Sequence, residues 1–174
     1  RAFLDDLIRE SECRSLYSFE TDILQHKLHD FKVMGYKYEK YFEIIDSMKT
    51  YYKATMDMKN RDISREVFSL DTPIYTKVRD VAPAKYGIDC SVKSSLVADG
   101  CIIDGYVENS VLFRGVKVGK GAVIKDSIVM QGAVIEEKAS FINAIADKDV
   151  TITKNRTITG SADFPVYISK GGVV

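Results

Sequence analysis

The apolar positions of the first 72 residues mostly recur at steps of three and four, which is the spacing of an amphipathic helix. This pattern predicts helices over 2–10, 19–28, 47–59 and 63–70. Ser18 is the predicted N-cap of the second helix. The stretch 31–45 is instead rich in β-branched and aromatic residues and predicts one or two strands. Several helices with little sheet fit the closing part of a larger α/β domain better than a domain of their own.

After residue 72 a different pattern begins, in which four segments align with one another. They are 95–103, 110–118, 127–135 and 144–152. Their starts lie 15, 17 and 17 residues apart, and a Gly or Asp turn stands at the same place in each. In the last three, another apolar residue follows six positions after the end: Ile124, Phe141 and Ile158. The pattern is typical of coils built from short strands, because steps of about six within a period of about 17 give three sides per coil.

One such coil cannot bury its own apolar face, whereas stacked coils share a continuous core. We therefore predict a mainly β fold, a parallel β-helix of hexapeptide repeats over roughly 87–160 with about four to five coils. An antiparallel β-sandwich is the alternative, and it does not account for four repeats in phase. Composition supports a division near residue 72, because only Gly35 precedes it, whereas ten Gly and all three Pro follow. We predict two regions, 1–72 and 73–174.

Charge and cysteine content narrow the class of protein. The 174 residues hold 25 Lys and Arg against 25 Asp and Glu, so net charge gives no reason to bind nucleic acid or an anionic membrane. No apolar run approaches the ~20 residues of a spanning helix. Cys13, Cys90 and Cys101 are scattered, which indicates reduced thiols and a cytoplasmic protein. Because the first residue is Arg, we expect the sequence to be part of a longer protein.

The repeats lack the groups that several enzyme classes need. Hexapeptide proteins are often acyltransferases with a histidine base, but His26 and His29 both precede the repeats, and we interpret them as residues that favour a helix end. A zinc site is not expected either, and Cys90 and Cys101 are interpreted as buried structural thiols. The glycines of 115–121, G-V-K-V-G-K-G, resemble a phosphate loop, but Gly stands where Ser or Thr should be, so we predict turns.

Several stretches resemble glucose-1-phosphate adenylyltransferases. Residues 47–58, S-M-K-T-Y-Y-K-A-T-M-D-M, resemble the family's T-I-D-A-Y-W-E-A-N-M-D-L helix. Residues 73–76 and 83–86, P-I-Y-T and P-A-K-Y, resemble its P-I-[RY]-T and P-P-A-K-[FY] motifs. Residues 100–103 and 109–113, G-C-I-I and N-S-V-L-F, match two of its coils. The resemblance covers nearly the whole chain, and the order of the motifs is more specific than any one coil.

The resemblance implies an N-terminal α/β nucleotidyltransferase domain followed by a left-handed β-helix. Residues 1–72 would then be the closing segment of the first domain with its linker, and 73–174 the β-helix domain. The nucleotide loop and most of the magnesium site of the family have no counterpart here. We therefore expect no cofactor and no catalysis from these residues alone, and Mg²⁺ in a complete catalytic assembly.

Two departures from the family's motifs concern its sugar-phosphate site. Residues 40–47, K-Y-F-E-I-I-D-S, stand where the family has G-Y-W-R-D-V-G-T, which puts Phe42 at the Trp and Ile44 at the acid. Residues 18–24 stand where it has D-F-G-K-D-I-I, which puts Ser18 at the Asp and keeps Phe19. Isoleucine cannot ligate magnesium. A shift of the alignment by two residues would offer Glu43 or Asp46 instead.

These departures resemble a non-catalytic sister subunit, the D-type partner in bacterial glycogen biosynthesis. The partner would be a catalytic adenylyltransferase subunit that makes ADP-glucose and pyrophosphate from ATP and glucose 1-phosphate, in a homo- or hetero-tetramer. Lys85 lies in a motif that contacts anionic effectors in relatives, and an ordinary solvated lysine is the equal alternative. Two other hypotheses stay open: the C-terminal half of an active adenylyltransferase, and another sugar-nucleotide transferase with a β-helix domain.

Overall fold

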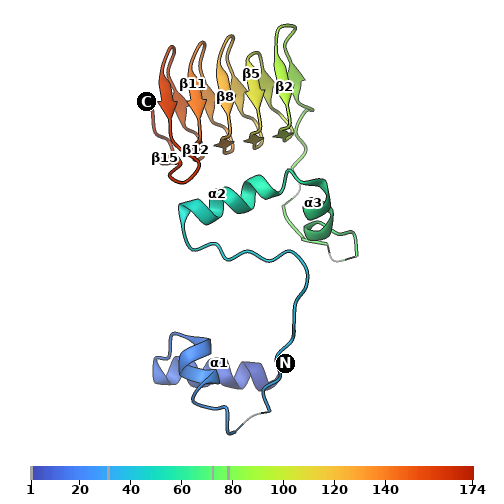
Figure 1. The fold of residues 1–174 in the computed structure, drawn as a ribbon, viewed down its shortest axis with the longest axis vertical. Coiled ribbons are helices and arrows are strands. Elements are labelled where there is room, and N and C mark those ends of the chain that lie inside the picture. The colour runs from blue at the N-terminus through green and yellow to red at the C-terminus, as the bar shows by residue number, and fades with distance from the viewer. Residues whose placement is uncertain (1, 31, 72, 78) are drawn as a thin grey trace. The chain divides into compact units, whose positions relative to one another are not determined.

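The computed structural model describes residues 2–30, 32–71, 73–77 and 79–174. Its contacts divide the chain into two compact units, one ending at Glu39 and the other beginning at Lys40 (Figure 1). The change from helices to strands lies near residue 72 as composition indicates, but the packing boundary falls earlier in the chain. The assignment of 1–72 to a nucleotidyltransferase domain stays a prediction.

The first unit is a small pair of helices. Helix α1 spans Ala2–Arg14 and η1, a π-helix, spans Phe19–Leu24. The Ser18 hydroxyl caps η1 by accepting a hydrogen bond from the Thr21 N–H at 3.2 Å, as its predicted N-cap role requires. Both predicted helices are present, although the second gives way to turns after Leu24 rather than continuing to residue 28. Leu7 and Ile23 are the buried apolar side chains among the described residues of this unit.

The strands predicted for 31–45 are absent from the described part of that stretch, 32–45, which is an extended segment without a ladder. Phe31 lies outside the described residues. The prediction was wrong because β propensity reflects a fit to a half-buried sheet and does not form a strand without a hydrogen-bonding neighbour. The side chains that suggested a strand are exposed instead; Tyr36, for example, is 88% exposed.

The second unit contains two predicted helices that the structure confirms, after its part of the extended segment. Helix α2 spans Met48–Asp57 and α3 spans Arg61–Val67. A capping box starts α2, in which the Ser47 hydroxyl accepts from the Thr50 N–H at 3.2 Å while the Thr50 hydroxyl accepts from the Ser47 N–H at 3.0 Å. Asn60 caps α3 through Asp62 N–H at 2.9 Å.

The remainder of this unit is a parallel β-solenoid of hexapeptide repeats with three five-stranded sheets (Figure 1). The first sheet consists of β1 (Lys85–Tyr86), β4 (Ile102–Ile103), β7 (Lys117–Val118), β10 (Val134–Ile135) and β13 (Thr151–Ile152). The second consists of β2 (Ser91–Lys93), β5 (Tyr106–Glu108), β8 (Val123–Lys125), β11 (Ser140–Ile142) and β14 (Thr157–Thr159). The third consists of β3 (Leu96–Val97), β6 (Val111–Leu112), β9 (Ile128–Val129), β12 (Ala144–Ala146) and β15 (Val166–Ile168).

The predicted β-helix is thus confirmed, and its strands extend beyond 87–160 at both ends. The left-handed winding implied by the resemblance stays a prediction. Every strand pair is parallel and in the register of the sequence repeat, so that Ile124 pairs with Phe141 and Phe141 with Ile158. Their side chains belong to one core along the coil axis. Cys101 is fully buried in this core, as predicted, whereas Cys90 is only half-buried and packs against it.

The corners between sheets use the left-handed backbone region. Gly100, Gly115 and Gly132 have φ between 69° and 75°, and Asp149 takes the equivalent corner with φ 59°. Gly115 and Gly121 are therefore turn residues, which agrees with the rejection of a phosphate loop. At another corner, Asn109 and Asp126 adopt φ of 49° and 46°.

A column of serine hydroxyls links the coils beside that corner. The Ser110 hydroxyl donates to the Glu108 carbonyl at 2.7 Å and accepts from the Ser127 N–H of the next coil at 3.1 Å. Likewise, the Ser127 hydroxyl donates to the Lys125 carbonyl at 2.6 Å and accepts from the Ala144 N–H of the next coil at 3.2 Å. Ser110 and Ser127 are fully buried, so this column supplies hydrogen bonds that a dry core would otherwise leave unmade.

The C-terminal end continues the solenoid. Residues 166–168 form β15 and extend the third sheet. In the tail 171–174, the Gly172 carbonyl accepts from the Thr151 N–H at 2.8 Å and the Val174 carbonyl from the Thr153 N–H at 2.7 Å. The tail is ordered because it supplies the next hydrogen-bond partner of β13.

Candidate functional site

The most distinctive site outside the solenoid core is the junction where α2 covers the third sheet. By register, Leu96, Val111, Ile128, Ile145 and Tyr167 form the outward column of that sheet. An apolar outer face would be costly in water. Helix α2 covers it with Tyr52, which forms a buried cluster with Ile128 and Ile145.

A polar network holds the same helix at the corner of the solenoid. The Tyr52 hydroxyl donates to the backbone carbonyl of Asp126 at 2.7 Å. The Lys59 ammonium group donates to the backbone carbonyl of Asn109 at 3.1 Å and also to its side-chain oxygen. The Asn109 amide in turn donates to the Asp126 carboxylate. The network thus connects α2 and the residue after it to corner residues of two consecutive coils.

Burial changes the acid–base properties of this network. Burial raises the pKa of Tyr52 to about 12, and the nearby Asp126 carboxylate acts in the same direction. Burial lowers the pKa of Lys59, while the Asp126 and Asp57 carboxylates oppose that change. Beside the network, burial and a 3.1 Å hydrogen bond to Asp57 raise the pKa of Tyr41 to about 12.

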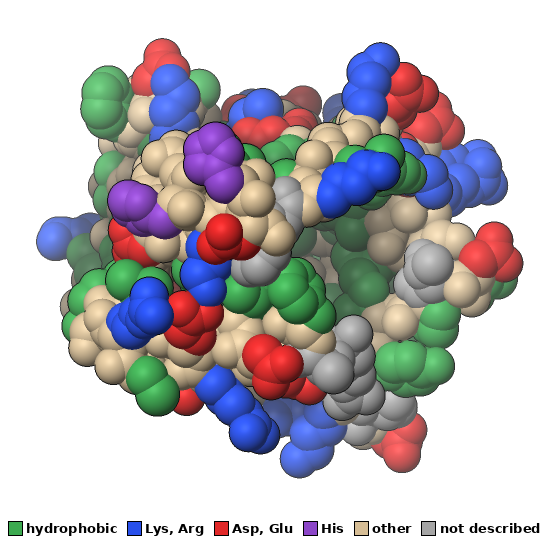
Figure 2. All heavy atoms as spheres, turned by 90° about the horizontal axis from the view of Figure 1, so that it is seen from below, with side chains coloured by type: hydrophobic (Ala, Val, Ile, Leu, Met, Phe, Trp, Pro, Cys, Tyr) green, Lys and Arg blue, Asp and Glu red, His purple; other side chains and the backbone are tan. Residues whose placement is uncertain are grey.

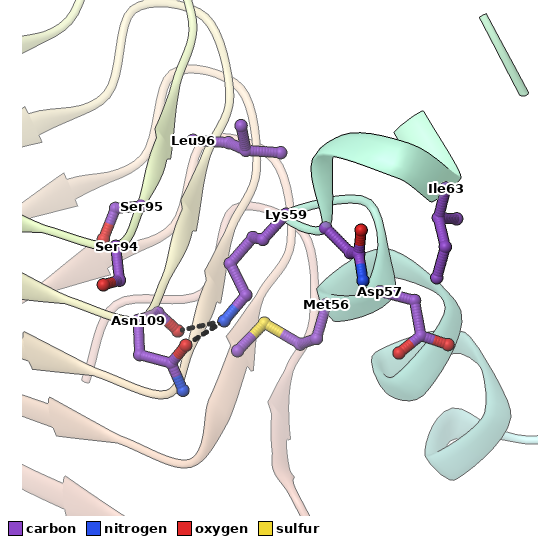
Figure 3. A pocket seen from close by; sticks show the side chains of 9 residues that line it. Met56, Asp57, Lys59, Ile63, Ser94, Ser95, Leu96 and Asn109 are labelled. Carbon is purple, nitrogen blue, oxygen red and sulfur yellow. Dashed lines mark hydrogen bonds between the residues drawn. The ribbon is translucent and has the colours of Figure 1, made fainter. Parts of the chain in front are cut away.

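A polar cavity of about 520 Å³ opens between α2, α3 and the solenoid corner (Figure 3). Lys59 crosses it towards Asn109, and Ser94 and Ser95 line the opposite wall. Met56, Ile63 and Leu96 add apolar surface. A cation, hydroxyl groups and an amide are groups that hold polar ligands, but here the ammonium group and the Asn109 oxygen already satisfy each other.

An apolar groove of about 520 Å³ lies along α2 and α3 in the same unit. Its walls are Ile45, Tyr51, Met58, Val67 and Phe113 among others. Its one acid is Glu43, and the Lys53 ammonium group binds both carboxylate oxygens of Glu43 at 3.0 Å. The groove therefore offers apolar surface rather than a free charge.

The predicted sugar-phosphate-site residues are divided between the two units. Ser18 and Phe19 belong to the first unit, where Ser18 acts as a helix cap and Phe19 is exposed. Phe42 and Ile44 belong to the second, and both are exposed in the extended segment, with Phe42 at the apolar groove. Nothing in these positions tests their assignment as remnants of a site, which stays a prediction.

Lys85 lies on β1 and is exposed at the outer face of the first sheet, paired by register with Ile102. Its predicted effector role is untested. The histidine side chains are exposed and visible on the face drawn in Figure 2. Within the described ranges, no three His, Cys, Asp or Glu side chains gather as metal ligands, and no helix has both the length and the apolar character to cross a membrane.

Lys59, Asn109 and Asp126 were not predicted as interacting residues from the sequence. One signal for the junction was available: strands of the third sheet carry adjacent apolar residues, such as Ile128 and Val129, where a one-sided strand would alternate. Every strand of the third sheet carries such a pair, whereas β1, β7 and β13 of the first sheet each carry a polar residue. The unbroken series of pairs indicates that the third sheet is covered on both faces. Lys59 gave no signal, because a lone lysine after a helix is usually solvated.

Fold and sequence comparisons now define the class of protein. Three parallel sheets joined by short corners, with a period of about 17 residues, define a hexapeptide-repeat β-solenoid. Residues 81–173 match the family described as GlmU-like, C-terminal hexapeptide, and the chain belongs to that family.

Three curated proteins match more of the chain than the repeat region alone. The chain is 44% identical over 139 residues to the glycogen biosynthesis protein GlgD of Bacillus subtilis, covering 80% of this chain and 40% of that protein. It is 38% identical over 133 residues to GlgD of Geobacillus stearothermophilus, covering 63% of this chain and 37% of that protein. It is 38% identical over 152 residues to a glucose-1-phosphate adenylyltransferase of Acetivibrio thermocellus, covering 86% of this chain and 35% of that protein. The chain therefore spans about two fifths of the length of these relatives.

Proposed function

We propose that the protein to which these residues belong acts in glycogen biosynthesis as a non-catalytic subunit of glucose-1-phosphate adenylyltransferase. A catalytic partner subunit would convert ATP and glucose 1-phosphate to ADP-glucose and pyrophosphate. The observation that carries the proposal is the 44% identity to a protein named for glycogen biosynthesis over 80% of the chain. Ile44 and Ser18, where the family's motifs have acids, support the non-catalytic role.

The chemistry of these two positions explains why a subunit of this kind would not turn over by itself. A magnesium ion at a phosphate needs carboxylate ligands, and its loss removes several kcal/mol of transition-state stabilisation, on the order of what metal catalysis supplies. Isoleucine has no ligand atom, and a serine hydroxyl carries no charge. A catalytic partner with both acids would supply the reaction, and the assembly would be a homo- or hetero-tetramer in the cytoplasm.

The decisive experiment measures ADP-glucose synthesis by the full-length protein alone and mixed with the catalytic homologue of the same organism. We expect no turnover alone, and a changed rate or effector response in the mixture. Turnover by the protein alone, close to that of the homologue, would refute the proposal.

The second candidate is the C-terminal half of an active glucose-1-phosphate adenylyltransferase. It is favoured by 38% identity to a protein of that name over 86% of the chain. Magnesium-dependent turnover without a partner would establish it, and would mean that Glu43 or Asp46 rather than Ile44 stands at the position of the acid. Synthesis of a different nucleotide sugar would support the third hypothesis, another sugar-nucleotide transferase with a β-helix domain.

Lys85 is proposed as a contact for an anionic effector. The test compares Lys85→Ala with Lys117→Ala, a matched control because both lysines lie in the outward column of the first sheet. In the mixed assembly, Lys85→Ala should raise the effector concentration for half-maximal response, and Lys117→Ala should not. An equal response of both variants would leave Lys85 as an ordinary solvated lysine.

A further inference from the structure

The polar cavity between α2, α3 and the solenoid corner is lined by groups that the surrounding network leaves partly unused (Figure 3). A lysine ammonium group has three N–H donors, and Lys59 directs its hydrogen bonds to two oxygens of Asn109, which leaves one donor. Asp57 accepts from the Tyr41 hydroxyl through one carboxylate oxygen and keeps the other. The Ser94 hydroxyl forms no hydrogen bond with the described residues. The cavity therefore offers both donors and acceptors.

A further amide and an apolar patch complete the lining of this cavity. The Asn60 side-chain oxygen accepts from the Asp62 N–H at 2.9 Å, so its NH₂ group stays available. Between the polar groups lies apolar surface from Met56, Ile63 and Leu96. The volume of about 520 Å³ lies within the range of pockets for small molecules, about 300–1,000 Å³. A sugar ring matches such a lining, because its hydroxyls both donate and accept while its C–H groups are apolar.

The charges around the cavity favour a neutral ligand. Lys59 and Asp57 are the charged side chains of the lining, one of each sign, and the Asp126 carboxylate also acts on Lys59. A phosphate would meet the Asp57 carboxylate and would gain little from a lysine that is already paired, since like charges brought together are costly.

We propose that this cavity binds a neutral glucose unit, either free glucose or the end of an α-glucan chain. The neutral sugar chemistry follows from the lining. The choice of glucose among neutral sugars rests on the proposed function, because two of the relatives are named for glycogen biosynthesis. Lys59, Asn60 and Ser94 would donate to the ring hydroxyls, Asp57 would accept from one of them, and the apolar patch would contact the C–H face.

Saturation-transfer difference NMR on the full-length protein tests this site, with glucose and maltotriose as the probes. We expect a saturable signal from the sugar protons. Ser94→Ala should weaken binding about three- to tenfold, which corresponds to one lost hydrogen bond. Ser15→Ala is the matched control and should change nothing, because Ser15 is also exposed and has φ 54° against 47° at Ser94, so both variants carry the same backbone strain. Tighter binding of maltotriose than of glucose would identify the ligand as a glucan end, and equal binding as free glucose.

A second variant guards against a loss of binding that comes from the fold alone. Asn60→Ser keeps a residue that caps helices well and removes the amide donors, so it should weaken sugar binding to a similar degree while the melting temperature stays close to that of the parent. The absence of a saturable signal would overturn the proposal. So would a signal that neither Ser94→Ala nor Asn60→Ser weakens, because the sugar would then bind elsewhere in the protein.

Inorganic phosphate is the remaining probe. Displacement of the sugar by phosphate would mean that the cavity is an anion site, which would also overturn the proposal. Sugar binding is measured without ATP or a catalytic partner, whereas the proposed function is tested by ADP-glucose synthesis. A failure of sugar binding would therefore leave the proposed subunit role standing, and turnover by the protein alone would leave the sugar site standing.

Discussion

The ammonium group of Lys59 donates hydrogen bonds to both the backbone carbonyl and the side-chain oxygen of Asn109, a residue 50 positions later in the chain. Asn109 stands at a solenoid corner with a positive φ, and its amide binds the Asp126 carboxylate of the next coil. The lysine thus joins the end of α2 to two consecutive coils. This contact, together with Tyr52, decides where the helix lies on the third sheet.

Lys59→Met keeps the length of the side chain and removes its charge and donors. We expect the free energy of unfolding to fall by about 1–2 kcal/mol, because the Asn109 oxygens lose a charged donor in a half-buried place. Chemical denaturation of the second unit measures the change. Lys53→Met is the control, since the Lys53 ammonium group is exposed and its ion pair with Glu43 should contribute less than the half-buried contacts of Lys59. An equal loss in both variants would mean that Lys59 does not anchor α2.

Alkaline pH should weaken the same junction through Tyr52. Its pKa is about 12 when folded, against about 10 for an unfolded tyrosine. The folded state therefore favours the neutral phenol, so its contribution is complete below about pH 10 and is lost as pH rises through about 12. Between about pH 9 and 12 the parent protein should lose roughly 2 kcal/mol more than Tyr52→Phe.

The matched control for that pH dependence is Tyr17→Phe, because Tyr17 is 94% exposed. That variant should follow the parent curve at every pH. If Tyr52→Phe also followed the parent curve, the hydroxyl of Tyr52 would be titrating as a solvated phenol, and its bond to Asp126 would be absent in solution. Tyr52→Phe should also cost about 1 kcal/mol near neutral pH for the lost hydrogen bond.

The sequence predicts a segment of this fold well where the pattern itself also shows which segments it pairs and packs with. The solenoid was predictable because every coil repeats the one before it, so that a position such as Ile124 has the same neighbours as Phe141. The predicted strands at 31–45 failed because a strand needs a partner, and none of the described residues provides one. The order of the tail at 171–174 was not predictable from composition, because it depends on hydrogen bonds to β13 that only the fold brings about.

The candidate site was predictable only in part. Ser18 was predictable as a helix cap from its residue type and position, and it acts as one. The cap role of Ser47 was not predicted, although the helix was expected to begin there. The Lys59–Asn109 contact was not predictable, because it needs the distance between a helix end and a corner that folding alone brings together. Adjacent apolar residues such as Ile128 and Val129 do indicate that the outer face of the third sheet is covered, but this becomes clear only when the strands of all three sheets are compared.

The buried serine column predicts a cost for losing one hydroxyl. Ser127→Ala leaves the Ala144 N–H without its acceptor in a fully buried place. We expect a loss of about 1–3 kcal/mol in the free energy of unfolding. Ser95→Ala is the control at the end of the column, where the Ser95 hydroxyl accepts from the Ser110 N–H at 3.1 Å in a half-buried place, and it should cost less. A loss at Ser127 as small as the one at Ser95 would contradict the expectation that the Ala144 N–H is left without a partner.

Gly115 and Gly119, both in the sequence G-V-K-V-G-K-G, require glycine for different physical reasons, which substitution by alanine should separate. Gly115 has φ 69° with open space where a Cβ would stand, so Gly115→Ala should cost only the left-handed backbone strain of about 1 kcal/mol. A Cβ on Gly119 would lie 2.7 Å from the Glu137 backbone nitrogen of the next coil. Gly119→Ala must therefore push two coils apart, and we expect a loss of at least about 2–3 kcal/mol. Thermal unfolding of the two variants side by side measures the difference, and a Gly119→Ala variant as stable as Gly115→Ala would show that the coils are not stacked at this spacing in solution.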